Sequence, residues 1–525
     1  MAPVAAGRGL RWTGLHLSAT VRPSKSWNTS RAAAMALNHS FTGTSLRLVS
    51  TSTSTSTSTS STSLAVSPVT QRSIHSSSRT DIQSSERRTS TIAEPLDTMV
   101  PMPGGASRAP LSVLPLSMIL RSLMTTTVSS SPALLPPSLR IMSMLAHTKN
   151  PLLHPDTNPI LRFALKHTFY AQFCAGENSP EVRNTIGKLK NIGFTGVILG
   201  YAREVVLSES ESKQLGADKP GLETEDGIRN EIDPWAMGTL ETVRLAEPGD
   251  FVALKFTGAG RAALHQLKNR TESSPHLYRR IDEICNLAAQ REVRLLFDAE
   301  QDSLQDGIDD WTMHFAKKYN TQNATIFGTY QAYKKNMPEV IASHLAMARE
   351  GGFQLGVKLV RGAYLGSDPR HRLHDTKEAT DDCYNGIAAS VLTRQWTDVV
   401  KGDGIYPSAS IVLATHNAES VRRARAICDA GVAKSPVAFA QLQGMADEVS
   451  CELVEASLQP SRTSASNLPT FKYLVWGTTG ECMKYLLRRA YENKDAVQRT
   501  RDGRDAMWGE LVRRCKAVVG LANSA

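Results

Sequence analysis

Between residues 191 and 515, eight short apolar segments alternate with helical ones, and this alternation limits the possible folds more than any other feature. Most segments are rich in Val, Ile, Leu or Phe, as expected for parallel strands covered on both faces. Eight strand–helix alternations over this length predict an α/β fold, a (β/α)8 barrel. The predicted strands are Phe194–Leu199, Phe251–Phe256, Val293–Phe297, Thr325–Thr329, Leu355–Val360, Ser410–Ala414, Val437–Ala440 and Tyr473–Trp476.

Helical spacing of apolar residues, with Pro and Gly at the ends of segments, predicts the helices. Within the barrel they are Asp233–Ala246, Pro275–Gln290, Asp302–Asn320 and Pro338–Glu350, and ahead of it Leu111–Met124, Ser138–His147, Asn158–Phe173 and Ser179–Asn191. The chain therefore divides into a disordered leader (1–100), an N-terminal helical region (101–190) that packs on the barrel, the barrel (191–515) and a C-terminal tail (516–525).

The basic charge of the chain is concentrated in its leader. Residues 1–80 hold eight Lys and Arg and no Asp or Glu, so they carry +8 of the formal +10. The rest of the chain is nearly neutral, which disfavours a nucleic-acid-binding function. An Arg- and Ser-rich segment without acids is typical of a mitochondrial transit peptide. A basic disordered tail is the alternative, and the Thr/Ser repeat Thr51–Ser63 is low-complexity sequence.

Two further classes of protein are disfavoured by simple patterns. The seven cysteines are scattered without a C-x-x-C pair, so neither a disulfide framework nor a zinc site is indicated. No apolar run reaches the roughly 18 residues that a membrane-spanning helix needs. The longest, Ala109–Leu120, is interrupted by two prolines, so membrane contact is expected to be peripheral.

Polar residues follow or end most of the predicted strands. In a (β/α)8 barrel the chemistry lies at the C-terminal mouth, where these residues converge. Charged groups at the ends of apolar strands need partners, and an internal ion-pair network that only fixes the barrel is the alternative to a binding site. The residues are Lys255, Asp298–Glu300, Gln331, Lys358, Arg361–Tyr364, Thr415–Asn417 and Tyr473.

A second constellation follows the eighth strand. On a helix, Tyr485, Arg488, Arg489 and Glu492 share one face. Two neighbouring guanidinium groups are suited to binding a small carboxylate through charge-assisted hydrogen bonds. An exposed salt-bridged face is the alternative, but the position next to the barrel mouth favours the carboxylate site.

Gly258–Ala263 matches the G-x-G-x-x-A pattern of a dinucleotide-binding turn. No acid ends a following strand about 20 residues later, as that turn requires, so we expect a tight turn into a barrel helix. A nicotinamide-linked dehydrogenase is the rival that uses this turn. His416 has no second ligand at metal-binding spacing, so no metal site is predicted.

Several stretches together resemble the proline dehydrogenases in their mitochondrial form, in the same order over about residues 110–515. They are Phe169–Glu177 (FYAQFCAGE), Leu295–Gln301 (LLFDAEQ), Gly328–Lys334 (GTYQAYK), Val357–Leu365 (VKLVRGAYL), Asp375–Asn385 (DTKEATDDCYN), Ala414–Ala418 (ATHNA) and Tyr485–Asn493 (YLLRRAYEN).

The resemblance implies an FAD lying across the barrel mouth. The residues expected to contact it are Gln331, Lys358, Val360, Gly362, Ala363, Tyr364, Thr415, His416, Asn417 and Glu492. Lys358 stands where bacterial relatives have Arg, which keeps the charge but loses the bidentate fork.

The resemblance also implies a substrate pocket with catalytic and binding residues. The catalytic set is Lys255, Asp298, Tyr473, Arg488 and Arg489, joined in substrate binding by Leu442, Tyr485 and the candidate gate residue Glu204. Relatives that prefer hydroxyproline carry a smaller residue at the place of Tyr473.

The implied reaction oxidises L-proline to 1-pyrroline-5-carboxylate by hydride transfer to the flavin and passes the electrons to ubiquinone. This is the first step of proline degradation to glutamate, on the matrix side of the mitochondrial inner membrane. A barrel retained only as a binding or scaffold protein is the non-enzymatic alternative.

Overall fold

The computed structural model describes residues 109–148, 150–202, 224–458, 468–495 and 497–519. The predicted leader, the C-terminal residues 520–525 and most of the segment after the first strand lie outside these ranges. None of the described helices is both long enough and apolar enough to cross a membrane.

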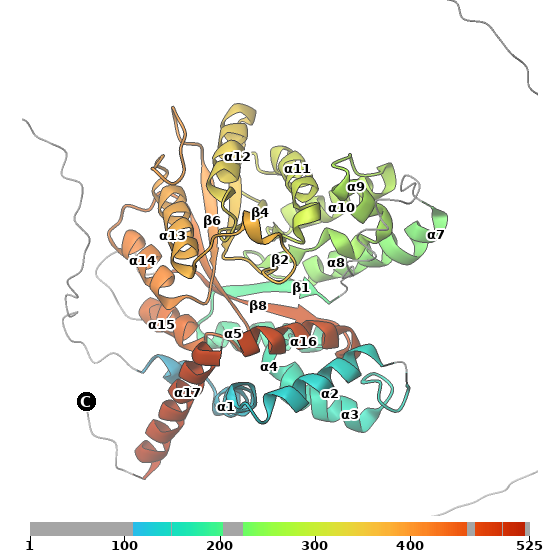
Figure 1. Ribbon diagram of the computed structural model, residues 1–525, viewed down its shortest axis with the longest axis vertical. Helices are drawn as coiled ribbons and strands as arrows, with labels where there is room; N and C mark the ends of the chain where they lie inside the picture. The colour runs from blue at the N-terminus through green and yellow to red at the C-terminus, as the bar shows by residue number, and fades with distance from the viewer. Residues whose placement is uncertain (1–108, 149, 203–223, 459–467, 496, 520–525) are drawn as a thin grey trace, which may run out of the picture. The chain divides into compact units, whose positions relative to one another are not determined.

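Eight parallel strands close into a barrel in sequence order, with β8 paired to β1 (Figure 1). The predicted (β/α)8 barrel is confirmed. The strands are β1 Gly196–Tyr201, β2 Phe251–Leu254, β3 Arg294–Phe297, β4 Ile326–Gln331, β5 Leu355–Val360, β6 Ala409–Ala414, β7 Val437–Leu442 and β8 Thr470–Trp476.

Side chains of alternate residues point into the barrel, because successive residues of a strand face opposite sides. At the N-terminal end, the rings of Phe251, Phe327 and Phe471 meet edge to face and fill the interior. The Arg294 guanidinium lies 3.7 Å from the Phe251 ring centroid. Towards the other end the inward residues become small, as with Ala253, so the interior opens there.

Helices cover the outside of the barrel and pack on it through the main apolar core. After β1 come a short turn α7 Glu225–Gly227, a π-helical turn η3 Ile228–Ile232 and α8 Asp233–Leu245. The remaining helices are α9 Arg261–Lys268, α10 Pro275–Gln290, α11 Asp302–Tyr319, α12 Met337–Gly351, α13 Lys377–Thr393, α14 Ala418–Asp429, α15 Asp447–Leu458, α16 Thr479–Asp495 and α17 Val497–Val518, with the 3-10 turns η4 Phe256–Ala259 and η5 Arg370–Arg372.

Of the N-terminal helices, α1 and α2 lie beside α17 and α16 (Figure 1), whereas α5 packs on the barrel against β1 and α8. The predicted helix Leu111–Met124 is wrong at its start, because Pro115 separates a 3-10 turn from the helix proper. The predicted helix Asn158–Phe173 is interrupted by a π-helical turn. The elements are η1 Pro110–Val113, α1 Leu116–Ser130, α2 Leu135–His147, α3 Pro159–Leu165, η2 Lys166–Tyr170, α4 Ala171–Phe173 and α5 Ser179–Ile192.

Two local features differ from, or sharpen, the sequence-based expectation. Strand β8 begins at Thr470, so Tyr473 is its fourth residue rather than its first. The Gly258–Ala263 segment is a tight turn into α9, as expected. The Arg261 backbone N–H at the start of α9 donates to the Glu231 carboxylate at 2.7 Å, so this helix terminus already holds an anion from the chain itself.

Candidate active site

A cavity of about 620 Å³ lies at the C-terminal mouth of the barrel. Seventeen of the residues singled out from the sequence line it, contributed by seven of the eight strand ends and by α16. They are Lys255, Asp298, Ala299, Gln331, Lys358, Val360, Arg361, Gly362, Ala363, Tyr364, Thr415, His416, Leu442, Tyr473, Tyr485, Arg488 and Arg489.

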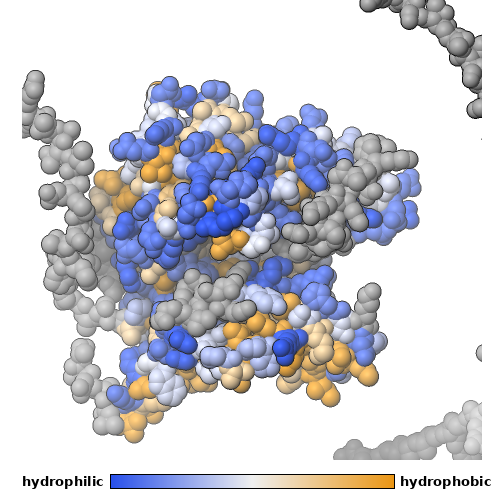
Figure 2. Space-filling view, viewed as in Figure 1, coloured by the Kyte–Doolittle hydropathy of each residue, from blue (hydrophilic) through white to orange (hydrophobic). Residues whose placement is uncertain are grey.

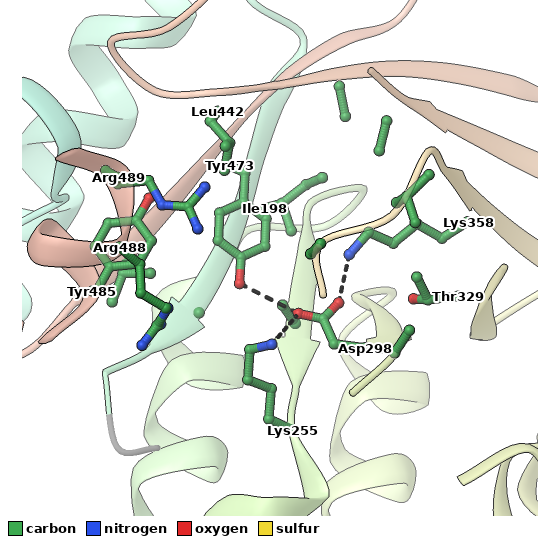
Figure 3. Close-up of a pocket in the computed structure, with 18 of the residues that line it drawn as sticks. Ile198, Lys255, Asp298, Thr329, Lys358, Leu442, Tyr473, Tyr485, Arg488 and Arg489 are labelled. Atoms are coloured by element: carbon green, nitrogen blue, oxygen red, sulfur yellow. Dashed lines mark hydrogen bonds and ion pairs between the residues drawn. The ribbon is translucent and has the colours of Figure 1, made fainter. Parts of the chain in front are cut away.

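One wall of the cavity holds a charged cluster around Asp298, the residue that follows β3 (Figure 3). The Lys358 ammonium pairs with Oδ1 of Asp298, and the Lys255 ammonium lies 3.4 Å from Oδ2. Burial opposes ionisation of Asp298, but the charges of Lys358 and Lys255 outweigh it and hold its pKa below the ordinary value. The cluster therefore carries one negative and two positive charges. Lys255 and Asp298, both expected in the catalytic set, form an ion pair.

Tyr473 stands between this cluster and the arginine pair (Figure 3). Its hydroxyl donates to Oδ2 of Asp298 at 3.4 Å, and the Lys358 ammonium lies 5.6 Å from its ring centroid. The ring is held by β8, a strand whose residues are mostly buried. Tyr473 thus presents an aromatic face to the cavity at a fixed position.

Helix α16 contributes Arg488, Arg489 and Tyr485 to the side of the cavity that lies opposite the charged cluster (Figure 3). Leu442, at the end of β7, lies on the same side. The Arg489 guanidinium lies 5.1 Å from the Tyr485 ring centroid, a cation–π geometry that orients it. Both arginines line the cavity and Tyr485 beside them is buried, so this helix face is not simply an exposed surface.

The first turn of α16 is fixed by carboxylates from the N-terminal region. Glu177 accepts hydrogen bonds from the backbone N–H of Thr479 at 3.0 Å and from its hydroxyl at 2.7 Å. Asp156 accepts from the backbone N–H of Gly480 at 2.8 Å. Both acids lie where the helix dipole favours negative charge.

Glu177 is itself held by two cations. Its side chain is 3% exposed and pairs with Arg162 at 2.8 Å and Lys166 at 2.7 Å. Burial opposes its ionisation, but hydrogen bonds from Arg162, Lys166 and Thr479 outweigh burial and hold its pKa at about 2. A charged network thus joins the segment before α5 to the helix that carries the arginine pair.

The side of the cavity formed by β4, β5 and β6 is built for close approach of a ligand. The Gln331 amide nitrogen is buried and has no hydrogen-bond partner among the described residues, while its oxygen accepts from the Ala363 backbone N–H at 3.4 Å. Gly362 has φ +146°, and a Cβ there would lie 2.5 Å from the Tyr333 ring. An unsatisfied buried donor beside exposed backbone fits a group rich in carbonyl oxygens.

The protonation of His416 follows from its hydrogen bonding. The backbone N–H of Leu442 donates to Nε2 of His416 at 3.1 Å. Nε2 therefore carries the lone pair, and in the neutral ring the proton is on Nδ1. Among the described residues, no group of three or more His, Cys, Asp or Glu is arranged to hold a metal ion.

Among the described residues singled out from the sequence, Glu300 and Asn417 do not line the cavity. Asn417 instead caps α14, its side chain accepting from the backbone N–H of Ser420 at 2.9 Å, which gives its predicted contact with a cofactor no support. Glu204 and the side chain of Glu492 lie outside the described residues.

Several cavity residues were missed from the sequence. Thr329 lies two residues before Gln331 on β4, and this period of two was the signal that would have found it. Arg361, by contrast, was singled out from the sequence, and in the structure it pairs with Asp381 and donates to the Ser420 hydroxyl at 2.7 Å. Trp235 and Thr239, from α8, have no comparable sequence signal because a helix outside the barrel supplies them.

Comparison with known proteins decides the family. Residues 182–502, more than half of the chain, match the family model described as proline dehydrogenase. The chain belongs to the proline dehydrogenase family. It is therefore an oxidoreductase of this family, and the resemblance found in the sequence is confirmed.

Similar members of the proline dehydrogenase family come from several eukaryotes. The chain is 29% identical over 406 residues to a probable mitochondrial proline dehydrogenase of Schizosaccharomyces pombe, covering 68% of this chain and 80% of that protein. It is 28% identical over 385 residues to a hydroxyproline dehydrogenase of Bos taurus, covering 67% and 81%. Against the human mitochondrial proline dehydrogenase 1, identity is 32% over 251 residues, 46% of this chain and 39% of that one.

Among solved structures, proline utilization A from Bdellovibrio bacteriovorus, inactivated by N-propargylglycine, has the same barrel fold. The TM-score is 0.51 at 17% identity, over 72% of this chain and 38% of that one. The chain therefore spans well under half the length of that protein, and the similarity supports the fold.

Proposed function

We propose that this protein is an FAD-dependent dehydrogenase that oxidises L-proline to 1-pyrroline-5-carboxylate and passes the electrons to a quinone. The observation that carries the proposal is one cavity with a guanidinium pair on one side and the Lys255–Asp298–Lys358 cluster on the other. Its volume of about 620 Å³ lies within the range of small-molecule sites, about 300–1,000 Å³.

The cavity residues fit a flavin. The amide nitrogen of Gln331, which has no partner among the described residues, the backbone at Gly362 and Ala363, and the Nδ1 proton of His416 lie on the side formed by β4, β5 and β6. These groups would hold the polar edge of the ring system. When bound, FAD supplies the acceptor for the hydride that leaves the substrate ring.

Arg488 and Arg489 would bind the substrate carboxylate. Two partly desolvated charges about 4 Å apart attract by roughly 4 kcal/mol at an effective dielectric of 20, before desolvation costs are subtracted. A carboxylate held from α16 leaves the ring of the amino acid directed into the cavity, where Tyr473 and Leu442 would exclude water from it.

The charged cluster would favour the reactive form of the substrate amine. Loss of hydride from the carbon next to nitrogen requires the nitrogen lone pair, so the amine must be neutral. Lys255, Lys358 and Asp298 together carry a net charge of +1. A nearby positive charge lowers the pKa of an amine and so increases its neutral fraction.

Two substrates are candidates within the family, L-proline and hydroxyproline, which differ by one hydroxyl group on the ring. Relatives similar to this chain include proteins named hydroxyproline dehydrogenase. The Tyr473 hydroxyl is directed at Asp298, and its ring lies between the charged cluster and the arginine pair. A substrate ring bound beside it with an added hydroxyl would need more room than L-proline does. This arrangement favours L-proline.

We place the reaction in the mitochondrion, on the matrix side of the inner membrane. The acid-free, Arg-rich residues 1–80 support import, and several relatives are named mitochondrial proteins. A quinone dissolved in that membrane would then accept the electrons.

The purified protein should be yellow and should reduce a soluble quinone analogue only when L-proline is added, with a cyclic imine as the product. A colourless protein that oxidises L-proline with a nicotinamide would overturn the flavin assignment. A yellow protein that binds proline without reducing the quinone would favour a binding protein.

A further inference from the structure

Helix α2 is apolar on two sides. Its inner side, formed by Leu135, Leu139, Met142 and Leu145, is buried in an apolar cluster shared with α16. On its outer side Ile141 and Met144 are 54% and 48% exposed, although both are large apolar residues. Large apolar side chains left in water cost free energy that a covering surface would recover. We therefore expect a partner surface to cover the outer side of α2.

The exposed apolar surface continues beyond α2 along the chain. Leu134 precedes the helix, Leu152 and Leu153 lie in the loop after it, and Ile160 and Phe163 lie on α3 at 81% and 65% exposure. These seven side chains form what we name the α2–α3 face: Leu134, Ile141, Met144, Leu152, Leu153, Ile160 and Phe163. Figure 2 shows hydrophobic residues gathered over α2 and α3, at the lower right.

The concentration is local rather than general. Of the 20 exposed large apolar side chains among the described residues, 10 lie between Leu116 and Phe163, and the other 10 are spread from Met237 to Val519. Scattered exposed apolar residues are normal on a soluble protein, whereas a contiguous patch marks an interaction surface.

The charge around the α2–α3 face indicates which partner it meets. Residues 134–163, which hold the α2–α3 face, contain three Lys or Arg residues and one acid, Asp156, whose carboxylate accepts hydrogen bonds from Gly480 and Thr478 at the start of α16. Arg140 is exposed on α2. A second copy docked through the same face would bring two segments of like net charge against each other. An apolar face on a segment with a net positive charge matches a lipid surface with anionic headgroups.

We propose that the α2–α3 face docks on an anionic lipid bilayer, with its apolar side chains inserted between the headgroups. The inference rests on the proposed function in one respect, since a lipid-dissolved quinone makes such docking useful. The inner side of α2 packs on α16, the helix that carries Arg488 and Arg489, so the docked face and the wall of the cavity belong to one packed unit.

The test is co-sedimentation of the full chain with phosphatidylcholine vesicles with and without cardiolipin. The variant Ile141→Glu/Met144→Glu places two charges in the α2–α3 face and should weaken binding to cardiolipin vesicles by about tenfold or more. The variant Ile160→Glu/Phe163→Glu repeats the test on a second element if the first fails to fold. Met347→Glu/Ile405→Glu, at exposed apolar positions on the barrel, is the matched control and should bind as the wild type does.

The basic leader is the same in every variant, so its contribution cancels in the comparison. Turnover with a soluble acceptor should be unchanged by the substitutions, whereas turnover with ubiquinone in the vesicles should fall with binding. Equal vesicle binding by wild type and both face variants would overturn the proposal. So would a wild-type dimer that the face variants dissociate without any change in vesicle binding. Because binding is measured without turnover, this result is separate from the fate of the proposed reaction.

Discussion

The Lys358 ammonium and the Asp298 carboxylate form an ion pair inside the barrel mouth, with side chains only 8% and 7% exposed. Lys358 comes from β5 and Asp298 follows β3, so the pair spans β4 between them. A charge buried from water is stable only while its oppositely charged partner is present. The pair therefore fixes the inner wall of the cavity as well as its charge.

Asp298→Asn should destabilise the protein strongly, by about 3 kcal/mol, because it leaves the buried Lys358 ammonium without its carboxylate. Urea denaturation monitored by circular dichroism measures the loss. Asp310→Asn, which breaks the exposed pair with Arg270, is the control and should cost under about 1 kcal/mol. Equal losses in the two variants would mean that the Asp298 cluster is not structurally important.

Arg488→Met and Arg489→Met should each raise the KM for L-proline by about tenfold or more, since each removes a charge-assisted hydrogen bond worth about 1.5–3 kcal/mol. Flavin content, read from the absorbance ratio of the purified proteins, should stay at the wild-type level. Arg422→Met, at an exposed arginine paired with Glu452, is the control. Unchanged kinetics in the double variant would remove the carboxylate-binding assignment.

Tyr473→Ser should shift the preference from L-proline towards hydroxyproline. The smaller side chain makes room for a hydroxyl group and offers it a hydrogen-bonding partner near Asp298. The measurement is the ratio of kcat/KM for the two substrates in the wild type and the variant. An unchanged ratio would show that Tyr473 does not determine specificity.

Glu177→Gln tests whether the network at the start of α16 positions the arginine pair. Arg488 is nine residues beyond Thr479, about 14 Å along the helix at 1.5 Å per residue, so a small tilt at the start displaces the guanidinium groups. The KM for L-proline should rise several-fold while kcat and flavin content change little. Glu181→Gln, which also loses a contact with Lys166, is the control. A loss of stability without a change in KM would indicate a purely structural role.

The effect of Glu177→Gln on stability depends on pH. The pKa of Glu177 is depressed from 4.5 to about 2, so its contribution to stability is fully present above 4.5 and declines as the pH falls towards 2. The wild type should therefore be more stable than Glu177→Gln at pH 7, and the gap should narrow below about pH 4.5. Denaturation midpoints at pH 7 and pH 4 measure this, and a gap that widens in acid would contradict the network.

The barrel could be predicted because its strands are short apolar runs with clear breaks. Strand β5, Leu355–Val360, and helix α10, Pro275–Gln290, have the predicted bounds. The start of β8 was missed because Lys472 is charged. The structure pairs it with Asp447 at 2.7 Å, with the Lys472 side chain only 1% exposed, a compensation that arises only in the folded chain.

The candidate site was predictable as a set of residues but not as a set of contacts. Strand ends and helix spacing identified most of the cavity lining. They did not indicate that Asp298 faces the two lysines while Glu300 instead binds the backbone and hydroxyl of Thr257. Both acids follow β3, and which one turns inward depends on the path of the chain beyond the strand. The role of Glu177 was also missed, because its partner Thr479 lies 302 residues away in the sequence.

The most direct test is anaerobic addition of L-proline to the purified protein while its flavin absorbance is recorded. We expect the visible band to bleach completely in the wild type and to require a much higher proline concentration in the Arg488→Met/Arg489→Met double variant. A wild-type band that L-proline leaves unchanged, or equal bleaching in the two proteins, would contradict the account.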